Sequence, residues 1–126
     1  MTNESTHILI VEDNKDNQEL ATWILEDEGY SVTCADSAEE GLELLELRKF
    51  DLILMDVSLP GMSGKDATVK IKSSPHLSDI PVIALTAHAV KGEKEEIEAS
   101  GVDGLLTKPI DEELLIQTLE TILPSK

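Results

Sequence analysis

The feature that most constrains the fold is a fivefold alternation of a short apolar run with a stretch of helical periodicity. The apolar runs occupy residues 8–11 (ILIV), 31–35 (SVTCA), 52–55 (LILM), 82–85 (VIAL) and 105–106 (LL). Runs that are apolar on both faces are typical of parallel strands covered by helices on each side of a sheet. The run at 31–35 is less apolar than the others, and we interpret it as an edge strand.

The stretches between the runs have apolar residues three and four positions apart, as amphipathic helices do. The expected helices, with the residues that mark them, begin near Asn14 (Leu20, Ile24, Leu25), after Ser37 (Ala38, Gly41, Leu42, Leu45), after Gly64 (Ala67, Thr68, Ile71) and at Asp111 (Leu115, Leu119, Ile122). Two pairs have the spacing of a capping box, and they are Ser37 with Glu40 and Ser63 with Asp66. Asp111 fits an N-cap. Residues 91–100 predict a thinly anchored surface helix, because Ile97 is their main large apolar side chain.

A strand followed by a helix, repeated five times with right-handed crossovers, gives an α/β fold with a doubly wound parallel sheet. In such sheets ligands bind beyond the carboxyl ends of the strands. The fold therefore selects the residues after each run, before their chemical type is considered. They are Glu12 and Asp13, then Asp56, then Thr86 and Ala87, and finally Thr107, Lys108 and Pro109.

Three acids and one lysine at one sheet edge predict a magnesium site. Carboxylates that lie close together repel one another unless a cation is present, and Mg²⁺ prefers oxygen ligands. We expect Asp13 and Asp56 to be direct ligands and Glu12 to act through water. The backbone carbonyl of Ser58 is a further candidate ligand.

The same residues predict phosphoryl chemistry. With Mg²⁺ bound, a carboxylate oxygen of Asp56 can attack a phosphoryl group and form an aspartyl phosphate. The ion and Lys108 would neutralise the charge that develops on the phosphoryl oxygens. Thr86 can donate a hydrogen bond to the product, and the small side chain of Ala87 leaves room for it.

Composition excludes several other classes of protein. Lys and Arg total 10 and Asp and Glu total 26, so the formal net charge of −16 disfavours nucleic acids and anionic membranes as partners. No apolar run approaches the roughly 18 residues of a spanning helix. The start of the chain lacks the features of a secretory signal, and Cys34 is the only cysteine, so we expect a cytoplasmic location.

Four segments resemble the receiver domain of two-component response regulators. They are residues 8–14 (ILIVEDN), 54–64 (LMDVSLPGMSG), 83–87 (IALTA) and 106–109 (LTKP), and the resemblance covers residues 7–123. It implies the flavodoxin-like (βα)5 fold of the bacterial chemotaxis regulator, with strand order 2-1-3-4-5. Residues 1–6 are then a polar lead and residues 124–126 a tail.

The resemblance also implies roles for individual residues. Asp56 would take a phosphoryl group from a phosphohistidine, with Glu12 and Asp13 holding Mg²⁺. Thr86 and Lys108 would sense the phosphoryl group, and the peptide bond before the following proline would be cis. The implied partners are a sensor histidine kinase or histidine phosphotransfer protein and a downstream target protein.

Two residues depart from the family pattern. Leu105 stands where the family usually has an aromatic residue that changes rotamer on activation, so the signalling step here would use another moving part. Glu12 replaces a common aspartate, and its longer side chain should adjust the water shell of the ion without abolishing the site.

The sequence thus predicts a signalling switch whose only reactions are self-catalysed phosphotransfer and autodephosphorylation. Because only three residues follow the last expected helix, we expect output through protein–protein contact or a phosphorelay. The helix at 91–100 is the expected mobile part. Two alternatives stay open, a pseudo-receiver that docks without phosphorylation and a Mg²⁺-dependent phosphatase with an aspartyl nucleophile. Ser58 disfavours the phosphatase, because many such enzymes have a second acid at that position.

Overall fold

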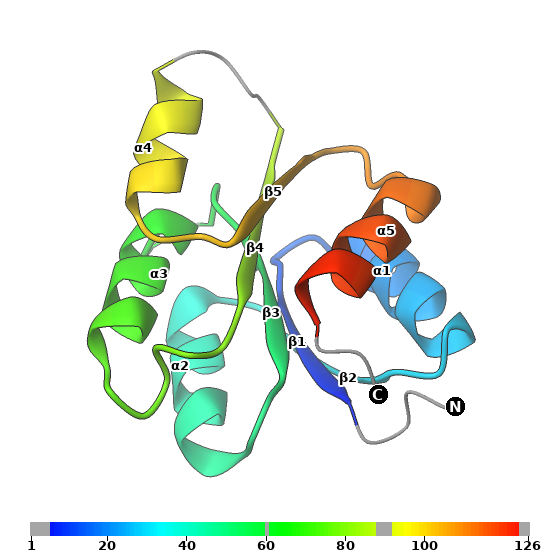
Figure 1. Cartoon of the computed structure of the whole chain (residues 1–126), viewed down its shortest axis with the longest axis horizontal. Helices are drawn as coiled ribbons and strands as arrows, with labels where there is room; N and C mark the ends of the chain where they lie inside the picture. The colour runs from blue at the N-terminus through cyan, green and yellow to red at the C-terminus, as the bar shows by residue number, and fades with distance from the viewer. Residues whose placement is uncertain (1–5, 60, 88–91, 124–126) are drawn as a thin grey trace.

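The computed structural model describes residues 6–59, 61–87 and 92–123, in which strands and helices alternate along the chain (Figure 1). The elements are β1 (His7–Val11), α1 (Lys15–Asp27), β2 (Ser31–Ala35), α2 (Ala38–Leu47), β3 (Leu52–Asp56), α3 (Gly64–Ser73), β4 (Val82–Thr86), α4 (Glu93–Ala99), β5 (Gly104–Thr107) and α5 (Glu112–Ile122). None of these helices has the length and apolar character needed to cross a bilayer.

All five strands are parallel and lie in the order β2-β1-β3-β4-β5, which confirms the predicted fold class and strand order. The strand at 31–35 lies at an edge of the sheet, as its mixed composition predicted. The register aligns Val11 with Met55, and Asp56 with Leu85. The residues at the carboxyl ends of these strands are therefore brought to a single edge of the sheet.

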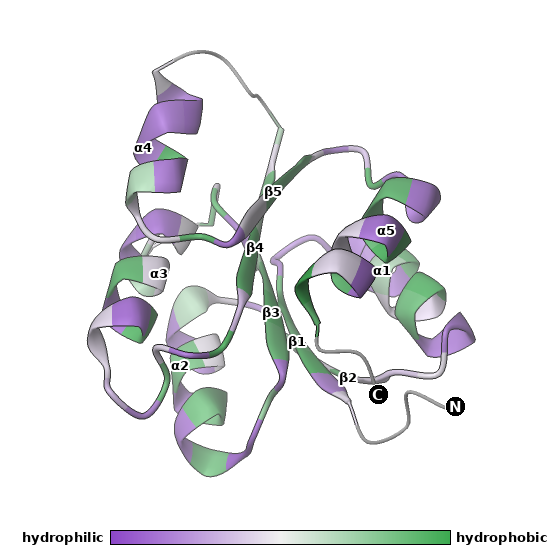
Figure 2. Ribbon diagram, in the orientation of Figure 1, coloured by the Kyte–Doolittle hydropathy of each residue, from purple (hydrophilic) through white to green (hydrophobic). Residues whose placement is uncertain are grey.

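Helices cover the two faces of the sheet in separate layers (Figure 1). Alternate residues of β1 point to opposite faces, as strand geometry requires. Ile8 and Ile10 join a core with α1 and α5, whereas Leu9 and Val11 join a core with α2 and α3. The strands are accordingly apolar along most of their length (Figure 2). Burial on both faces explains why the sequence of the central strands shows apolar runs and no polar–apolar alternation.

Four helix starts have the caps expected of them. The side chains of Asn14, Ser37, Ser63 and Asp111 each accept a hydrogen bond from the backbone N–H three residues later. The second half of the predicted box at Ser37 differs, because the Glu40 carboxylate accepts the N–H of Asp36 at 2.6 Å. That bond ties the end of the β2–α2 loop to the first turn of α2.

Helix α1 exists as predicted, and Ile24 and Leu25, two of the three residues expected to mark its core side, are buried. Leu20 was expected to mark the core side, and it is 38% exposed. The buried residues are Gln18, Ala21, Ile24 and Leu25, which follow the spacing i, i+3, i+6, i+7. A polar residue occupies the first position of this stripe because its amide is used at the sheet edge, as described below.

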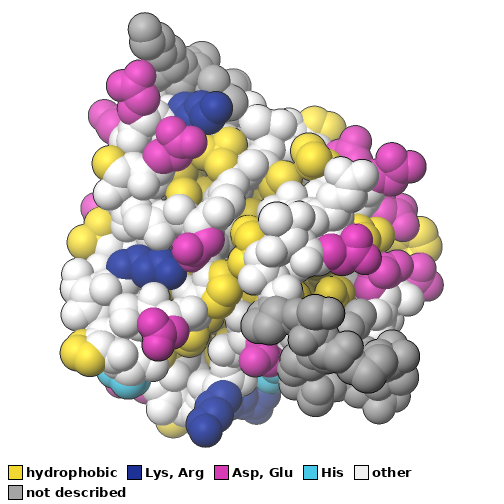
Figure 3. Space-filling model, viewed as in Figure 1, with side chains coloured by type: hydrophobic (Ala, Val, Ile, Leu, Met, Phe, Trp, Pro, Cys, Tyr) yellow, Lys and Arg dark blue, Asp and Glu magenta, His cyan; other side chains and the backbone are white. Residues whose placement is uncertain are grey.

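Helix α4 is short and weakly anchored, which agrees with the interpretation of residues 91–100, although residue 91 lies outside the described residues. Ile97 is its one buried residue within Glu93–Ala99, and it packs near Val57 and Ala84. The N-cap residue Gly92 supplies no side-chain hydrogen bond. Acidic side chains gather on the surface over α4 and over α1 and α5 (Figure 3).

Candidate functional site

The ladder of the sheet positions the residues that follow the strands. The N–H of Glu12 donates to the carbonyl of Ala35 at 3.0 Å, and the N–H of Lys108 donates to the carbonyl of Thr86 at 2.8 Å. Asp56 is itself the last residue of β3. These backbones are held by regular sheet pairing, so their side chains project from a rigid edge.

Three carboxylates converge at this edge, as the sequence predicted. Glu12, Asp13 and Asp56 each offer an oxygen atom within 4.8 Å of the others. Glu12 and Asp56 are each 1% exposed, whereas Asp13 is exposed. Buried like charges at this separation are unfavourable without a compensating cation.

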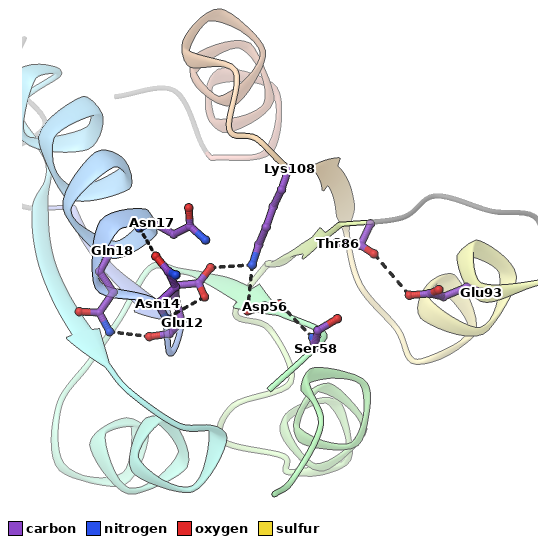
Figure 4. A network of polar contacts seen from close by, with 9 residues as sticks. All are labelled: Glu12, Asn14, Asn17, Gln18, Asp56, Ser58, Thr86, Glu93 and Lys108. Atoms are coloured by element: carbon purple, nitrogen blue, oxygen red, sulfur yellow. Dashed lines mark hydrogen bonds and ion pairs between the residues drawn. The ribbon is translucent and has the colours of Figure 1, made fainter. Parts of the chain in front are cut away.

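Lys108 supplies part of that compensation. Its Nζ atom lies 2.9 Å from Glu12 Oε1 and 3.0 Å from Asp56 Oδ2 (Figure 4). Burial lowers the pKa of the Lys108 ammonium, but its contacts with the carboxylates of Glu12 and Asp56 together outweigh burial and raise the pKa above its usual value. Lys108 therefore remains a cation at neutral pH.

Glu12 is a buried acid whose charge is only partly compensated. Burial raises the pKa of the Glu12 carboxyl, contact with Lys108 opposes this rise, and the neighbouring Asp56 adds to it. The net shift is upward. Glu12 Oε1 forms an ion pair with Lys108, but it receives no hydrogen bond from the described residues.

The Asp56 carboxylate has a fixed orientation. Its Oδ1 atom accepts the N–H of Ser58 at 2.9 Å, and its Oδ2 atom accepts a hydrogen bond from Lys108. The backbone behind it is also closely packed, since a Cβ atom on Gly64 would lie 2.1 Å from the Asp56 carbonyl oxygen. The two hydrogen bonds therefore hold the Asp56 carboxylate in one orientation.

A second group of polar residues supports Glu12, and the sequence analysis missed it. Gln18 is buried, and its Nε2 donates to the Glu12 carbonyl at 2.5 Å and to Asp36 Oδ1 at 2.7 Å. Lys15 bonds the same Asp36 oxygen at 2.8 Å. The N–H of Asn14 donates to Glu12 Oε2 at 3.2 Å. The available signal was the polar Gln18 in the apolar stripe of α1.

Thr86 lies beside the acids, but its hydroxyl is directed elsewhere. The residue is fully buried, and its Oγ1 donates to Glu93 Oε1 at 3.4 Å. Figure 4 shows the hydroxyl pointing toward α4, away from Asp56 and Lys108. Ala87 follows it and is exposed, so no large side chain stands at this position.

Two further features predicted from the sequence lie on or after β5: Leu105 and the peptide bond before Pro109. Leu105 is partly buried and packs against the cluster of Val57, Ala84 and Ile97. It therefore joins β5 to α4 through apolar contact alone. The peptide bond between Lys108 and Pro109 is cis, as the resemblance implied.

The donor set fits a hard divalent cation. The cluster offers the oxygen ligands that Mg²⁺ takes, from two buried carboxylates (Glu12 and Asp56) and one exposed carboxylate (Asp13). Glu12, Asp13 and Asp56 each offer one such oxygen. One of the buried oxygens, Glu12 Oε1, has no hydrogen bond from the described residues. Glu12 and Asp56 are both in contact with Lys108.

Comparisons with known proteins agree with this geometry. The family model described as "Response regulator receiver domain" matches residues 8–120. The polar-differentiation response regulator DivK of Brucella ovis is 40% identical over 116 residues, which cover 92% of this chain and 94% of DivK. The receiver domain of the sensor histidine kinase PA1611 from Pseudomonas aeruginosa, solved with magnesium in its active site cleft, has a TM-score of 0.88 and 34% identity, covering 95% of this chain and 98% of that one.

Receiver sequences also occur within much longer proteins. The sensor histidine kinase GacS of Pseudomonas protegens is 38% identical over 122 residues, which cover 94% of this chain. The same match covers 13% of the kinase, so the chain corresponds to a small part of that protein.

Proposed function

Because this chain belongs to the response regulator receiver domain family, we propose that Asp56 accepts a phosphoryl group from a phosphohistidine and that the phosphorylated chain signals to another protein. The observation that carries the proposal is the Asp56 carboxylate, which is buried, oriented by Ser58 and bonded to Lys108 within a cluster of acids. Residues 7–123 act as the signalling unit in this proposal.

We propose the same magnesium ligands that the sequence led us to expect, and the convergence of Glu12, Asp13 and Asp56 supports them. Asp13, Asp56 and the backbone carbonyl of Ser58 would hold the ion directly, and Glu12 would reach it through water. Bound Mg²⁺ supplies charge neutralisation to the phosphoryl oxygens. Lys108 adds a second positive charge on the Asp56 side of the cluster.

The transfer itself uses this chain's own carboxylate. An oxygen of Asp56 forms a bond to phosphorus while the bond from phosphorus to the donor imidazole nitrogen breaks, and the electron pair of that bond stays on the nitrogen. Autodephosphorylation follows when water attacks phosphorus and the Asp56 carboxylate leaves. In both steps Lys108 stays protonated and compensates the phosphoryl charge.

Signalling would follow from the added charge. We expect a phosphoryl group on Asp56 to contact Thr86 and Ala87, which stand at the end of the neighbouring strand β4, and we expect Thr86 to turn its hydroxyl to that group. This biases an equilibrium between two arrangements of the α4, β5 and α5 surface. Because Leu105 stands where the family usually has an aromatic residue, we propose that the change is transmitted through the apolar contact of β5 with Ile97 of α4. Since the formal charge of the chain is −16, we expect partners with basic surfaces and association that slows with salt.

The test is phosphorylation by a small donor. The chain is incubated with acetyl phosphate and Mg²⁺, and its intact mass is measured by mass spectrometry, with an EDTA-treated sample as the control. We expect one phosphoryl group per chain, and none with EDTA. No adduct together with no Mg²⁺ binding would overturn the proposal in favour of a pseudo-receiver. Continuous release of phosphate from an unrelated monoester would instead identify a phosphatase.

Lys108→Ala is expected to slow formation of the adduct by about tenfold or more, because a charge-assisted hydrogen bond is lost and two buried acids lose their ammonium partner. The rate is measured by intact mass at several times after adding acetyl phosphate. Lys94→Ala is the matched control, since Lys94 is exposed and lies on α4. Equal rates for the two variants would contradict the role given to Lys108.

A further inference from the structure

The contact between Thr86 and Glu93 links the end of β4 to the first turn of α4. Thr86 Oγ1 donates to Glu93 Oε1 at 3.4 Å, which is longer than the roughly 3.0 Å upper limit of a typical O–H···O bond and makes this a weak hydrogen bond. The two residues come from different elements, on either side of the segment 88–91. Figure 4 shows the two side chains directed toward each other, with Lys108 and Asp56 on the other side of Thr86.

The backbone of Thr86 is fixed, so its hydroxyl can change partner only by side-chain rotation. Thr86 is the last residue of β4, it is fully buried, and its carbonyl accepts the N–H of Lys108 at 2.8 Å. The side chain of a threonine can adopt any one of three staggered rotamers. Its hydroxyl has a single hydrogen to donate. A hydrogen bond to Glu93 and a hydrogen bond to a phosphoryl group on Asp56 therefore exclude each other.

We propose that Glu93 is a positioning residue that competes with the phosphoryl group for the Thr86 hydroxyl. The inference rests on the proposed function, and it adds a residue on α4 to the set that determines how strongly the site holds a phosphoryl group. In the unphosphorylated chain the carboxylate of Glu93 holds the hydroxyl away from Asp56. On phosphorylation the hydroxyl leaves Glu93, and the first turn of α4 loses its hydrogen bond to β4.

The setting of Glu93 makes this exchange consequential. Helix α4 buries only Ile97 among Glu93–Ala99, and the ion pair of Glu96 with Lys65 at 2.9 Å is largely exposed. Exposed ion pairs stabilise a fold little. The Thr86 bond is thus one of few polar connections from α4 to the rest of the described chain. A phosphoryl group also brings about two negative charges near the Glu93 carboxylate, which favours separation of α4 from the site.

The test measures binding of a phosphoryl mimic. Beryllofluoride with Mg²⁺ is titrated by isothermal calorimetry into the wild-type chain, Glu93→Ala and Glu95→Ala. Glu95→Ala is the matched control, because Glu95 is exposed in the same first turn of α4 and its substitution removes the same charge. We expect Glu93→Ala to bind the mimic about fivefold more tightly than Glu95→Ala, or about 1 kcal/mol at 1.4 kcal/mol per tenfold change.

Repeating the comparison in variants of Thr86 distinguishes the effect of the hydrogen bond from the effect of the Glu93 charge. In Thr86→Val, which lacks the hydroxyl, removing Glu93 should change the affinity no more than removing Glu95. In Thr86→Ser, which keeps the hydroxyl, the fivefold difference should return. Circular dichroism checks that each variant is folded.

The outcomes distinguish this inference from the proposed function. If the wild-type chain binds the mimic and Glu93→Ala behaves like Glu95→Ala, the competition is wrong and the phosphoacceptor function stands. If the difference persists unchanged in Thr86→Val, Glu93 acts by charge alone and the inference is again wrong. If the wild-type chain binds no beryllofluoride and gains no phosphoryl group, the proposed function itself fails.

Discussion

Asp56→Asn is expected to gain no detectable phosphoryl group from acetyl phosphate, a loss of at least about a thousandfold in rate. The amide has the shape of the carboxylate and can still accept the N–H of Ser58, so the loop should be preserved. It lacks the anionic oxygen needed to attack phosphorus, and its neutral oxygen attracts a divalent cation less strongly. Intact mass after incubation with Mg²⁺ and donor gives the result directly.

Asp66→Asn is the control for this experiment, because Asp66 is exposed in the first turn of α3 and lies outside the acidic cluster. It should be phosphorylated as fast as the wild-type chain. An adduct on Asp56→Asn at the wild-type rate would mean that another residue is the acceptor.

Gly64→Ala is expected to destabilise the fold by about 3 kcal/mol or more, at the upper end of the range for overpacked sites. A Cβ atom there would lie 2.1 Å from the Asp56 carbonyl oxygen and 2.8 Å from Val57 Cα. Both are backbone atoms held by β3 and its extension, which cannot move as a side chain can. Urea unfolding followed by circular dichroism measures the change.

Gly104→Ala is the matched control, because its nearest neighbour would be the terminal methyl of Ile122 at 3.1 Å, the end of a flexible side chain. We expect it to change the free energy of unfolding by less than about 1 kcal/mol. The Gly64 variant should also form the Asp56 adduct more slowly, since relief of the clash must shift the Asp56 backbone. Equal stabilities for the two variants would show that the α3 start can move away from β3 without cost.

The sequence predicted the parts of this molecule that depend on periodicity and position along the chain. Apolar runs at 8–11, 52–55 and 82–85 are strands because both faces of each are covered, and the polar residues that follow them meet at one edge. The parallel arrangement makes this convergence a property of the topology. The sequence alone therefore predicted that Asp56 and Lys108 lie at the same edge of the sheet, where they are in contact.

Contacts that depend on side-chain direction could not be predicted in this way. Gln18 is buried in α1 with two hydrogen bonds to groups outside the helix, whereas Leu20 is exposed, and periodicity records neither. The direction of the Thr86 hydroxyl depends on where α4 places Glu93. Glu93 stands in a run of similar acids, so nothing in the sequence marked it out.

The candidate site is assembled from residues that are far apart along the chain, since the bond between Lys108 and Asp56 joins positions separated by 52. Unfolding disperses these ligands, and a divalent cation then has little left to bind. Magnesium should consequently act as a thermal stabiliser, adding about 1.4 kcal/mol at ten times its dissociation constant. Melting curves recorded over a range of magnesium concentrations should shift upward for the wild-type chain and much less for Asp56→Asn.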